Sequence, residues 1–373
     1  MAEENQVKRS LKTRHLSMIA LGGSIGTGLF VASGSAISQA GPGGAIVAYI
    51  GIGVMVYFLM TSLGEMATYL PVSGSFATYS RRFVDPALGF AMGWNYWFNW
   101  AITVAVDVST CALVLKFWFP HVPGWVFSLF ALLLVFLINA ISVKSFGETE
   151  YWLSLIKIVT VVIFLAVGVL TIFGILGGKA TYLHNFTYKK APFVGGIPAV
   201  LSVFVVAGFS FQGTELVGVT AGESENPAES VPKAIKQVFW RILLFYILSI
   251  FVIAAIIPYT SKYLLGSSAS DIAISPFTLV FKRAGLAAAA SVMNAVILTS
   301  VLSSANSGMY ASTRMLYSMA QDGDAPKIFA KVNKRGVPMA ALLGTAFVGL
   351  LTFLTSIFAN QIYQCLVAAS GLT

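Results

Sequence analysis

Charged side chains are scarce in this sequence. Asp, Glu, Lys and Arg make up only 10% of its 373 residues, whereas hydrophobic residues make up 57%. Soluble domains carry roughly 25% charged residues, and so few charges cannot cover the surface of a water-soluble globule of this length. The composition therefore excludes a soluble protein and indicates one that lies mostly in lipid.

Cysteine is almost absent as well. The two cysteines, Cys111 and Cys365, each lie in an apolar run, so neither a disulfide framework nor a zinc cluster can form. We expect no metal and no cofactor. No nucleophile–base motif or phosphate-binding loop is present, and the glycines near residue 25 do not follow a strand, as a dinucleotide site requires. We therefore expect that the protein is not an enzyme.

Apolar runs of about 20 residues, the length of a helix that crosses a bilayer, recur along the chain. They predict an all-α polytopic membrane protein with spans at 16–40, 44–69, 88–118, 124–143, 151–177, 196–222, 238–258, 286–320 and 339–358. A tenth run begins near Gln361 and stops at Thr373. Because a bilayer cannot leave the backbone of half a span unpaired, we expect further helices beyond Thr373.

Basic residues fall unequally on the two sides of these spans. With segment 1–15 in the cytoplasm, every Lys and Arg is cytoplasmic except Lys157 inside a span and seven external residues, which are Lys116, Lys179, Lys189, Lys190, Lys262, Lys282 and Arg283. The excess of inside positive charge predicts a cytoplasmic N-terminus. The net charge of +9 is thus typical of contact with membrane lipid rather than with nucleic acid. We place the protein in the cell inner (plasma) membrane.

Two of the spans are interrupted by glycine and polar residues. The first contains Leu21–Phe30, with glycines at 22, 23, 26 and 28, and the sixth contains Gly208–Glu215. Close packing of helices is one explanation, since small residues are common where membrane helices meet. An inverted-repeat transporter, however, needs a break in the first helix of each five-helix half. We therefore predict two repeats, 16–177 with helices 1–5 and 196–373 with helices 6–10, the tenth incomplete.

These motifs resemble those of the amino acid permeases in the amino acid–polyamine–organocation superfamily. The resemblance runs from about Leu11 to Thr373 and implies a twelve-helix fold with a five-plus-five inverted repeat, of which this chain holds nine helices and the start of a tenth. The motifs that carry it are Gly22-Gly23-Ser24-Ile25-Gly26-Thr27-Gly28-Leu29-Phe30, Pro71-Val72-Ser73-Gly74-Ser75-Phe76, Phe211-Gln212-Gly213-Thr214-Glu215 and Gly222-Glu223-Ser224-Glu225-Asn226-Pro227.

The two breaks offer opposite charges to the backbone of an amino acid. Amide groups at the start of the second half of the first helix suit a carboxylate. Carbonyl groups at the end of the first half of the sixth helix suit an ammonium group. The resemblance implies the same pairing and makes Phe209 a gating aromatic. The expected substrate-binding residues at the breaks are Ser24, Ile25, Gly26, Thr27, Gly28, Phe209, Ser210 and Phe211.

Two ionisable residues in the spans are candidates for proton coupling, because buried charges are costly and usually functional. Lys157 either extends to the membrane interface or is desolvated and able to lose its proton. In proton-coupled relatives a lysine occupies this position, facing the first-helix break, Ser303 and Ser304. Glu215 follows the sixth-helix break and either satisfies free amide groups or, as the resemblance implies, responds to protons.

The third span carries a polar stripe. Asn99, Thr103 and Asp107 recur every four residues on one face of an otherwise apolar helix. A helix–helix hydrogen bond is one explanation. In the family the corresponding stretch lines the pocket for the substrate side chain, where a carboxylate suits a cation such as lysine, and Ser304 could complete its hydrogen bonds.

Together these features predict a secondary transporter that imports L-lysine by proton symport and alternating access. One alternative is a permease for another amino acid, either arginine or a neutral one. A second is a membrane sensor that binds lysine and reports to a regulatory membrane partner, whose identity the sequence does not reveal.

Overall fold

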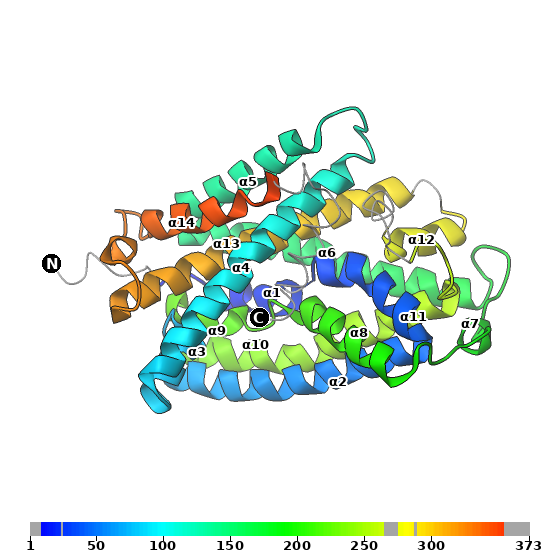
Figure 1. The fold of residues 1–373 in the computed structure, drawn as a ribbon, viewed down its shortest axis with the longest axis horizontal. Coiled ribbons are helices and arrows are strands. Elements are labelled where there is room, and N and C mark those ends of the chain that lie inside the picture. Colours follow the sequence, from blue (N-terminus) through cyan, green and yellow to red (C-terminus); the bar gives the residue numbers. More distant parts are fainter. Residues whose placement is uncertain (1–8, 24, 265–274, 287–288, 354–373) are drawn as a thin grey trace.

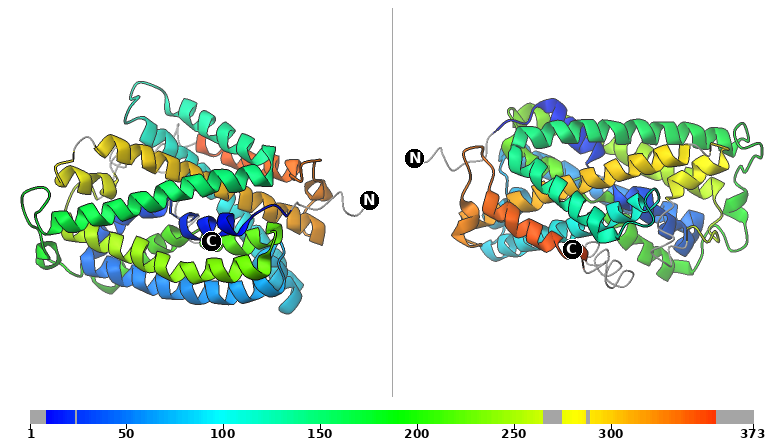
Figure 2. Two further views of the ribbon diagram at one scale, coloured as in Figure 1. Left: turned by 180° about the vertical axis from the view of Figure 1, so that it is seen from behind. Right: turned by 90° about the horizontal axis from the view of Figure 1, so that it is seen from above.

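The computed structural model describes residues 9–23, 25–264, 275–286 and 289–353 of the chain. Long helices run side by side along the long axis of the molecule (Figure 1), and they keep this common direction in both views of Figure 2. Residues 9–12, which precede α1 and contact Glu223, mark one end of the bundle, here called the N-terminal end, and α7 and α12 lie at the opposite end (Figure 1).

The first two predicted spans form one interrupted rod. It begins with α1 (Thr13–Gly22), resumes as a π-helical turn (Gly28–Ala32) and continues as α2 (Ser33–Tyr69). Inside α2, Gly41 has a φ of 75° and is followed by Pro42. Glycine tolerates this left-handed conformation, and proline cannot continue a regular helix. The bend therefore falls between the predicted spans 16–40 and 44–69.

The next helices follow the expected order. They are α3 (Ser75–Phe83), α4 (Pro86–Leu115), α5 (Gly124–Ile141), α6 (Val143–Ile172) and the short α7 (His184–Thr187). The start of α6 was expected near residue 151 but lies at Val143, because the Ser142 hydroxyl caps it by accepting a hydrogen bond from the Ser145 amide at 3.1 Å. This extension brings Glu150 into the helix.

The second half of the chain begins with a helix broken in two. Its helices are α8 (Gly196–Phe211), α9 (Leu216–Thr220), α10 (Pro227–Arg241), α11 (Leu248–Ile256), α12 (Pro276–Arg283), α13 (Ala289–Asp322) and α14 (Met339–Gly349), with a π-helical turn at Ile242–Ile247. The seventh span was expected to begin near residue 238, but α10 begins at Pro227. Its buried Val231, Ala234 and Val238 form one apolar stripe against the bundle.

Six helical stretches in the described ranges are long and apolar enough to cross a membrane. They are Gly28–Tyr69, Pro86–Leu115, Gly124–Ile141, Val143–Ile172, Gly196–Glu223 and Pro227–Ile256. The number is below the nine predicted spans partly because Gly28–Tyr69 joins two of them across the Gly41 bend. The all-α polytopic class is confirmed. The inverted relation of the repeats 16–177 and 196–373 stays a prediction, and the tenth apolar run lies outside the described residues.

The centre of the bundle is the packing of α13 along α4, while α2 packs along α8 (Figure 1). Gly308 of α13 allows the close approach, since a β-carbon there would lie 2.7 Å from the Trp100 ring of α4. Trp100 is itself buried. The second pair joins the two interrupted helices, since α2 continues the first rod and α8 is the first half of the broken helix.

Candidate functional site

The two helix breaks touch each other. A β-carbon on Gly28, where the first rod resumes, would lie 2.4 Å from the Ser210 Cα and 3.0 Å from the Phe209 carbonyl oxygen of α8. Only glycine permits this approach of backbone to backbone. The structure thus brings together the two segments that the sequence predicted to form one site.

The first break spans the residues between α1 and the π-helical turn. Its Ile25, Gly26 and Thr27 are buried, and the Ile25 amide donates to the Gly22 carbonyl at 3.1 Å. Gly22 ends α1 against α6, where a β-carbon would lie 2.4 Å from the Ser154 Oγ. Ser24, predicted to line this break, lies outside the described residues.

Asp107 of α4 is joined to the first break rather than to the other two polar residues of its stripe. The Thr27 hydroxyl donates to its Oδ1 at 2.8 Å, and Ser304 of α13 is a second hydrogen-bonding neighbour. The carboxylate is fully buried, and no donor in the described part of the chain reaches its Oδ2. Gly26 adjoins the same place, since its β-carbon would lie 3.0 Å from the Ser304 Oγ.

Asn99 and Thr103 contact the sixth-helix break instead. The Gln212 side-chain amide, in the residue after α8, donates to the Asn99 Oδ1 and, at 3.0 Å, to the Thr103 hydroxyl. The polar stripe on α4 was expected to act as one surface of a pocket. The stripe divides because Asn99 and Thr103 contact the sixth-helix break, whereas Asp107, one turn further along α4, contacts the first break. Helix α4 therefore contacts both breaks.

Glu215 closes the sixth-helix break. Its Oε2 accepts a hydrogen bond from the Gly213 amide at 2.9 Å, and its Oε1 accepts from the Tyr96 hydroxyl and the Trp100 indole at 3.1 Å each. The carboxylate therefore accepts a hydrogen bond from a free amide of the break and links the break to α4. This is the first of the two roles expected for Glu215 from the sequence. Its proton sensitivity stays a prediction.

The side chains at the end of α8 point in different directions. Phe209 packs against Ile102, Ala105 and Val106 of α4. Phe211 stacks on Tyr246 with ring centroids 4.2 Å apart. The Ser210 hydroxyl pairs with the Tyr49 hydroxyl at 2.8 Å. These side chains are all held by neighbouring helices, which leaves the backbone of α8 as the part that meets the first break.

A cavity of about 580 Å³ opens beside the sixth-helix break, between α2 and α4. Its polar lining includes Asn99, Gln212 and Glu215, and Phe209 and Phe211 form part of its apolar wall. Pockets of this size hold small molecules when a few polar groups converge on an apolar lining. The predicted residues of the sixth break and of α4 therefore border a space large enough for an amino acid.

Lys157 is completely buried and does not extend to the membrane interface. Its Nζ donates to the Gly22 carbonyl at 3.0 Å, at the last residue before the first break. The Nζ also lies 3.9 Å from the Oε1 of Glu150, which is equally buried. Lys157 thus faces the first break as predicted.

Glu150 lies one residue before the predicted span 151–177, yet it belongs to this buried site. Its Oε1 accepts hydrogen bonds from Ser303 of α13 at 2.5 Å and from Ser154 at 3.3 Å. Glu150 and Lys157 are seven residues apart, two turns of one helix, so they share a face of α6. The seven-residue spacing could have predicted that Glu150 and Lys157 share a face of α6. It could not predict that this face packs against α13, because that contact depends on the fold.

The N-terminal end of the bundle is closed by a network centred on Glu223. The Ser10 and Leu11 amides donate to the Glu223 carbonyl at 3.0 Å each. Its carboxylate accepts from the Arg314 Nε at 2.7 Å and from the Tyr310 hydroxyl at 2.6 Å. Both charged side chains are buried. Residues 10–11 ahead of α1, the segment after α9, and α13 are therefore joined at one point.

Replacing Glu223 by glutamine should destabilise this end. Arg314 would remain buried without a counter-charge, which costs about 3 kcal/mol. In purified protein we expect the temperature of thermal unfolding to fall by about 5 °C. The matched control is Glu225→Gln, an exposed acid two residues away, which should leave that temperature unchanged. Equal unfolding temperatures for Glu223→Gln and the parent would show that the ion pair does not hold this end closed.

These broken, touching helices in an all-α bundle have counterparts among known proteins. The family model described as amino acid permease matches residues 15–373. The chain belongs to the amino acid permease family and is a multi-pass membrane protein of amino acid transport, which confirms the family expected from its motifs.

Several curated relatives cover nearly the whole chain. The lysine-specific permease of Lactococcus lactis subsp. cremoris (strain MG1363) is 64% identical over an alignment of 376 positions, which covers 99% of this chain and 74% of that permease. The histidine permease of the same strain is 61% identical over 100% of this chain and 78% of its own length. The lysine-specific permease of Escherichia coli (strain K12) is 60% identical over 98% of this chain and 76% of its own length.

Proposed function

We propose that the protein imports L-lysine together with protons by alternating access. The observation that carries the choice of a cationic substrate is Asp107, a fully buried carboxylate at the first break whose Oδ2 accepts no hydrogen bond from the described residues. A buried carboxylate is costly unless a positive group compensates it. Two relatives named as lysine-specific permeases support the same choice.

The backbone of the substrate would lie between the two breaks. Amide groups near Gly26 and Gly28 suit its carboxylate, because helix N-termini bind anions. Carbonyl groups near Phe209 and Ser210 suit its ammonium group. The contact between Gly28 and Ser210 supports this assignment, because it sets the two segments close enough for one small molecule beside the contact to reach both.

Proton coupling would reside at Lys157, with Glu150 as its partner. The Lys157 ammonium connects the last carbonyl of α1 to a carboxylate on α6. Loss of its proton would weaken both contacts and free the first break to move, so protonation and the position of that break would be linked. Glu215 would organise the sixth-helix break in the same cycle.

The orientation follows from the distribution of charge. The excess of Lys and Arg at the N-terminal end supports a cytoplasmic N-terminus in the inner (plasma) membrane. The protein would act as a carrier rather than as an enzyme, and it needs no cofactor beyond the coupled proton. The histidine permease among the relatives makes histidine the competing substrate of first interest.

Replacing Asp107 by asparagine should change selectivity. The substitution keeps the size and the hydrogen bond to Thr27 but removes the charge. We expect lysine binding to weaken by about 1.5–3 kcal/mol, the scale of a hydrogen bond to a charged group, while the neutral analogue norleucine gains relative to lysine. The measurement is competition against labelled lysine in proteoliposomes.

The matched control for this change is Glu65→Gln, which removes an exposed carboxylate from α2 and should leave lysine affinity unaltered. If Asp107→Asn binds lysine as tightly as the parent, the carboxylate serves only to hold Thr27. In that case the lysine ammonium must be bound by carbonyl and hydroxyl groups.

The whole proposal is tested by competition of all twenty amino acids against labelled lysine uptake into proteoliposomes. We expect lysine to compete best and neutral amino acids poorly. If histidine, arginine or a neutral amino acid competes more strongly than lysine, that amino acid and not lysine is the preferred substrate. Binding of lysine without any uptake would identify a sensor instead of a carrier.

A further inference from the structure

The connections at the end of the bundle opposite the N-terminal end carry seven basic residues and one acidic residue. They are residues 116–123, 173–195 and 257–288, and the single acid among them, Asp271, lies outside the described residues. The basic residues in these connections are Lys116, Lys179, Lys189, Lys190, Lys262, Lys282 and Arg283. Such a concentration of one sign attracts anions.

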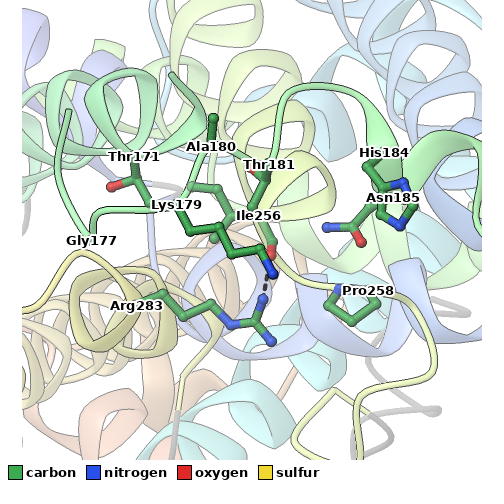
Figure 3. A pocket seen from close by; sticks show the side chains of 10 residues that line it. All are labelled: Thr171, Gly177, Lys179, Ala180, Thr181, His184, Asn185, Ile256, Pro258 and Arg283. Carbon is green, nitrogen blue, oxygen red and sulfur yellow. Dashed lines mark hydrogen bonds between the residues drawn. The ribbon is translucent and has the colours of Figure 1, made fainter. Parts of the chain in front are cut away.

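Two of these cations enter one cavity. The cavity has a volume of about 670 Å³ and lies between the loop after α6, the end of α11 and the end of α12. Lys179 reaches it from the loop and Arg283 from the last turn of α12, and their charged ends point toward one another in Figure 3. None of the residues that line it is acidic.

The walls of the cavity hold Arg283 in place. Its guanidinium donates to the Ile256 carbonyl at 2.6 Å, the last residue of α11. The loop packs directly on the end of α12, since a β-carbon on Gly177 would lie 2.3 Å from the Arg283 carbonyl oxygen. Thr181 adds a buried hydroxyl for which the described residues supply no hydrogen-bond partner. An anion between Lys179 and Arg283 would offset the repulsion between these two cations and accept a hydrogen bond from the Thr181 hydroxyl.

The cavity also lies where two apolar helices end, which is the level at which we expect lipid headgroups. The apolar helices α6 and α11 end at Ile172 and Ile256, and the lining residues begin at those ends. Beside the cavity the loop exposes large apolar side chains, namely Phe173, Ile175, Tyr182 and Leu183. A free anion gains nothing from apolar side chains beside its site, whereas the acyl chains of a lipid can pack against them.

We propose that this cavity binds the phosphate of an anionic phospholipid, held by Lys179, Arg283 and Thr181, with the lipid chains lying along the exposed loop residues. The bound lipid would contact both the loop after α6 and the ends of α11 and α12, and so hold the loop against these helices. This inference does not depend on the identity of the transported amino acid.

The test uses the purified full chain titrated with dioleoyl phosphatidylglycerol or dioleoyl phosphatidylcholine and followed by native mass spectrometry. We expect the double variant Lys179→Gln/Arg283→Gln to weaken phosphatidylglycerol binding roughly 30-fold, because it loses two cations that each contribute about 1 kcal/mol to the attraction of an anionic lipid. The matched control is Lys189→Gln/Lys190→Gln, which removes the same charge from the same end but not from the cavity lining. It should weaken binding less than about threefold.

Phosphatidylcholine should bind weakly and equally to all variants. Should the double variant fail to fold, Lys179→Gln alone, at an exposed side chain, is expected to weaken phosphatidylglycerol binding about fivefold. Equal losses in the cavity and control variants would overturn the proposal. The proposal would also be overturned if millimolar inorganic phosphate displaced the bound phosphatidylglycerol and stabilised the protein as much as the lipid does. That result would identify a site for free anions.

Discussion

Replacing Lys157 by alanine is expected to abolish the accumulation of lysine that a pH gradient drives. The side chain is fully buried and its ammonium connects the Gly22 carbonyl, at the first break, with Glu150 on α6. Without it, no protonation event can alter the contact between the break and α6. The measurement is uptake of labelled lysine into proteoliposomes under an imposed pH gradient.

Three further variants separate coupling from folding. Lys157→Arg keeps the positive charge beside Glu150 but cannot release a proton, so we expect a folded protein without gradient-driven accumulation. The double variant Lys157→Met/Glu150→Gln removes both charges, leaves neither unpaired, and should behave in the same way. Lys144→Ala, at an exposed lysine of the same helix, should accumulate lysine normally. Undiminished gradient-driven uptake by Lys157→Ala would remove this residue from the coupling mechanism.

The substitution Gly28→Val should eliminate transport of every substrate. Its β-carbon would lie 2.4 Å from the Ser210 Cα, an atom of the α8 backbone that has no rotamer to adopt. The two breaks would be forced apart, and groups from both could no longer hold one amino acid. We expect uptake to fall at least about 100-fold, the loss that follows when misplacement of about 1 Å disturbs a binding geometry.

Two comparisons give this result its meaning. Gly208→Ala is the matched control on α8, because a β-carbon there meets no atom within 4 Å, and it should transport normally. Gly26→Val would meet a side chain rather than backbone, since its β-carbon would lie 3.0 Å from the Ser304 Oγ. It should fold while weakening the binding of lysine and arginine alike. Lysinamide, which lacks the carboxylate, should compete poorly with lysine. Normal transport by a folded Gly28→Val variant would show that contact between the breaks is not required.

The sequence was most informative where local chemistry decides the structure. Helix breaks within Leu21–Phe30 and Gly208–Glu215 were predicted because glycine disfavours helix, and the structure has an interruption within each stretch, after Gly22 and after Phe211. Lys157 was predicted to face the first break, and its hydrogen bond to Gly22 confirms that position. The predicted division between the spans 16–40 and 44–69 coincides with the bend at Gly41 and Pro42.

The partners of these groups depend on packing between distant segments and were harder to predict. Glu150 belongs to the buried site because Ser303 and Asn306 of α13 face it, about 150 residues away along the chain. Asp107 and Thr103 share one face of α4, yet they bond to different breaks because those breaks lie at different heights along the helix. A helical period places side chains on a face, but it does not identify the neighbour of each turn.

Uptake of labelled lysine by the purified protein in sodium-free proteoliposomes, with and without an imposed pH gradient, tests lysine–proton symport most directly. With the interior alkaline, we expect lysine to accumulate above its external concentration, and a protonophore should abolish this accumulation. Accumulation that requires sodium, or lysine uptake that only equilibrates and ignores the pH gradient, would contradict it.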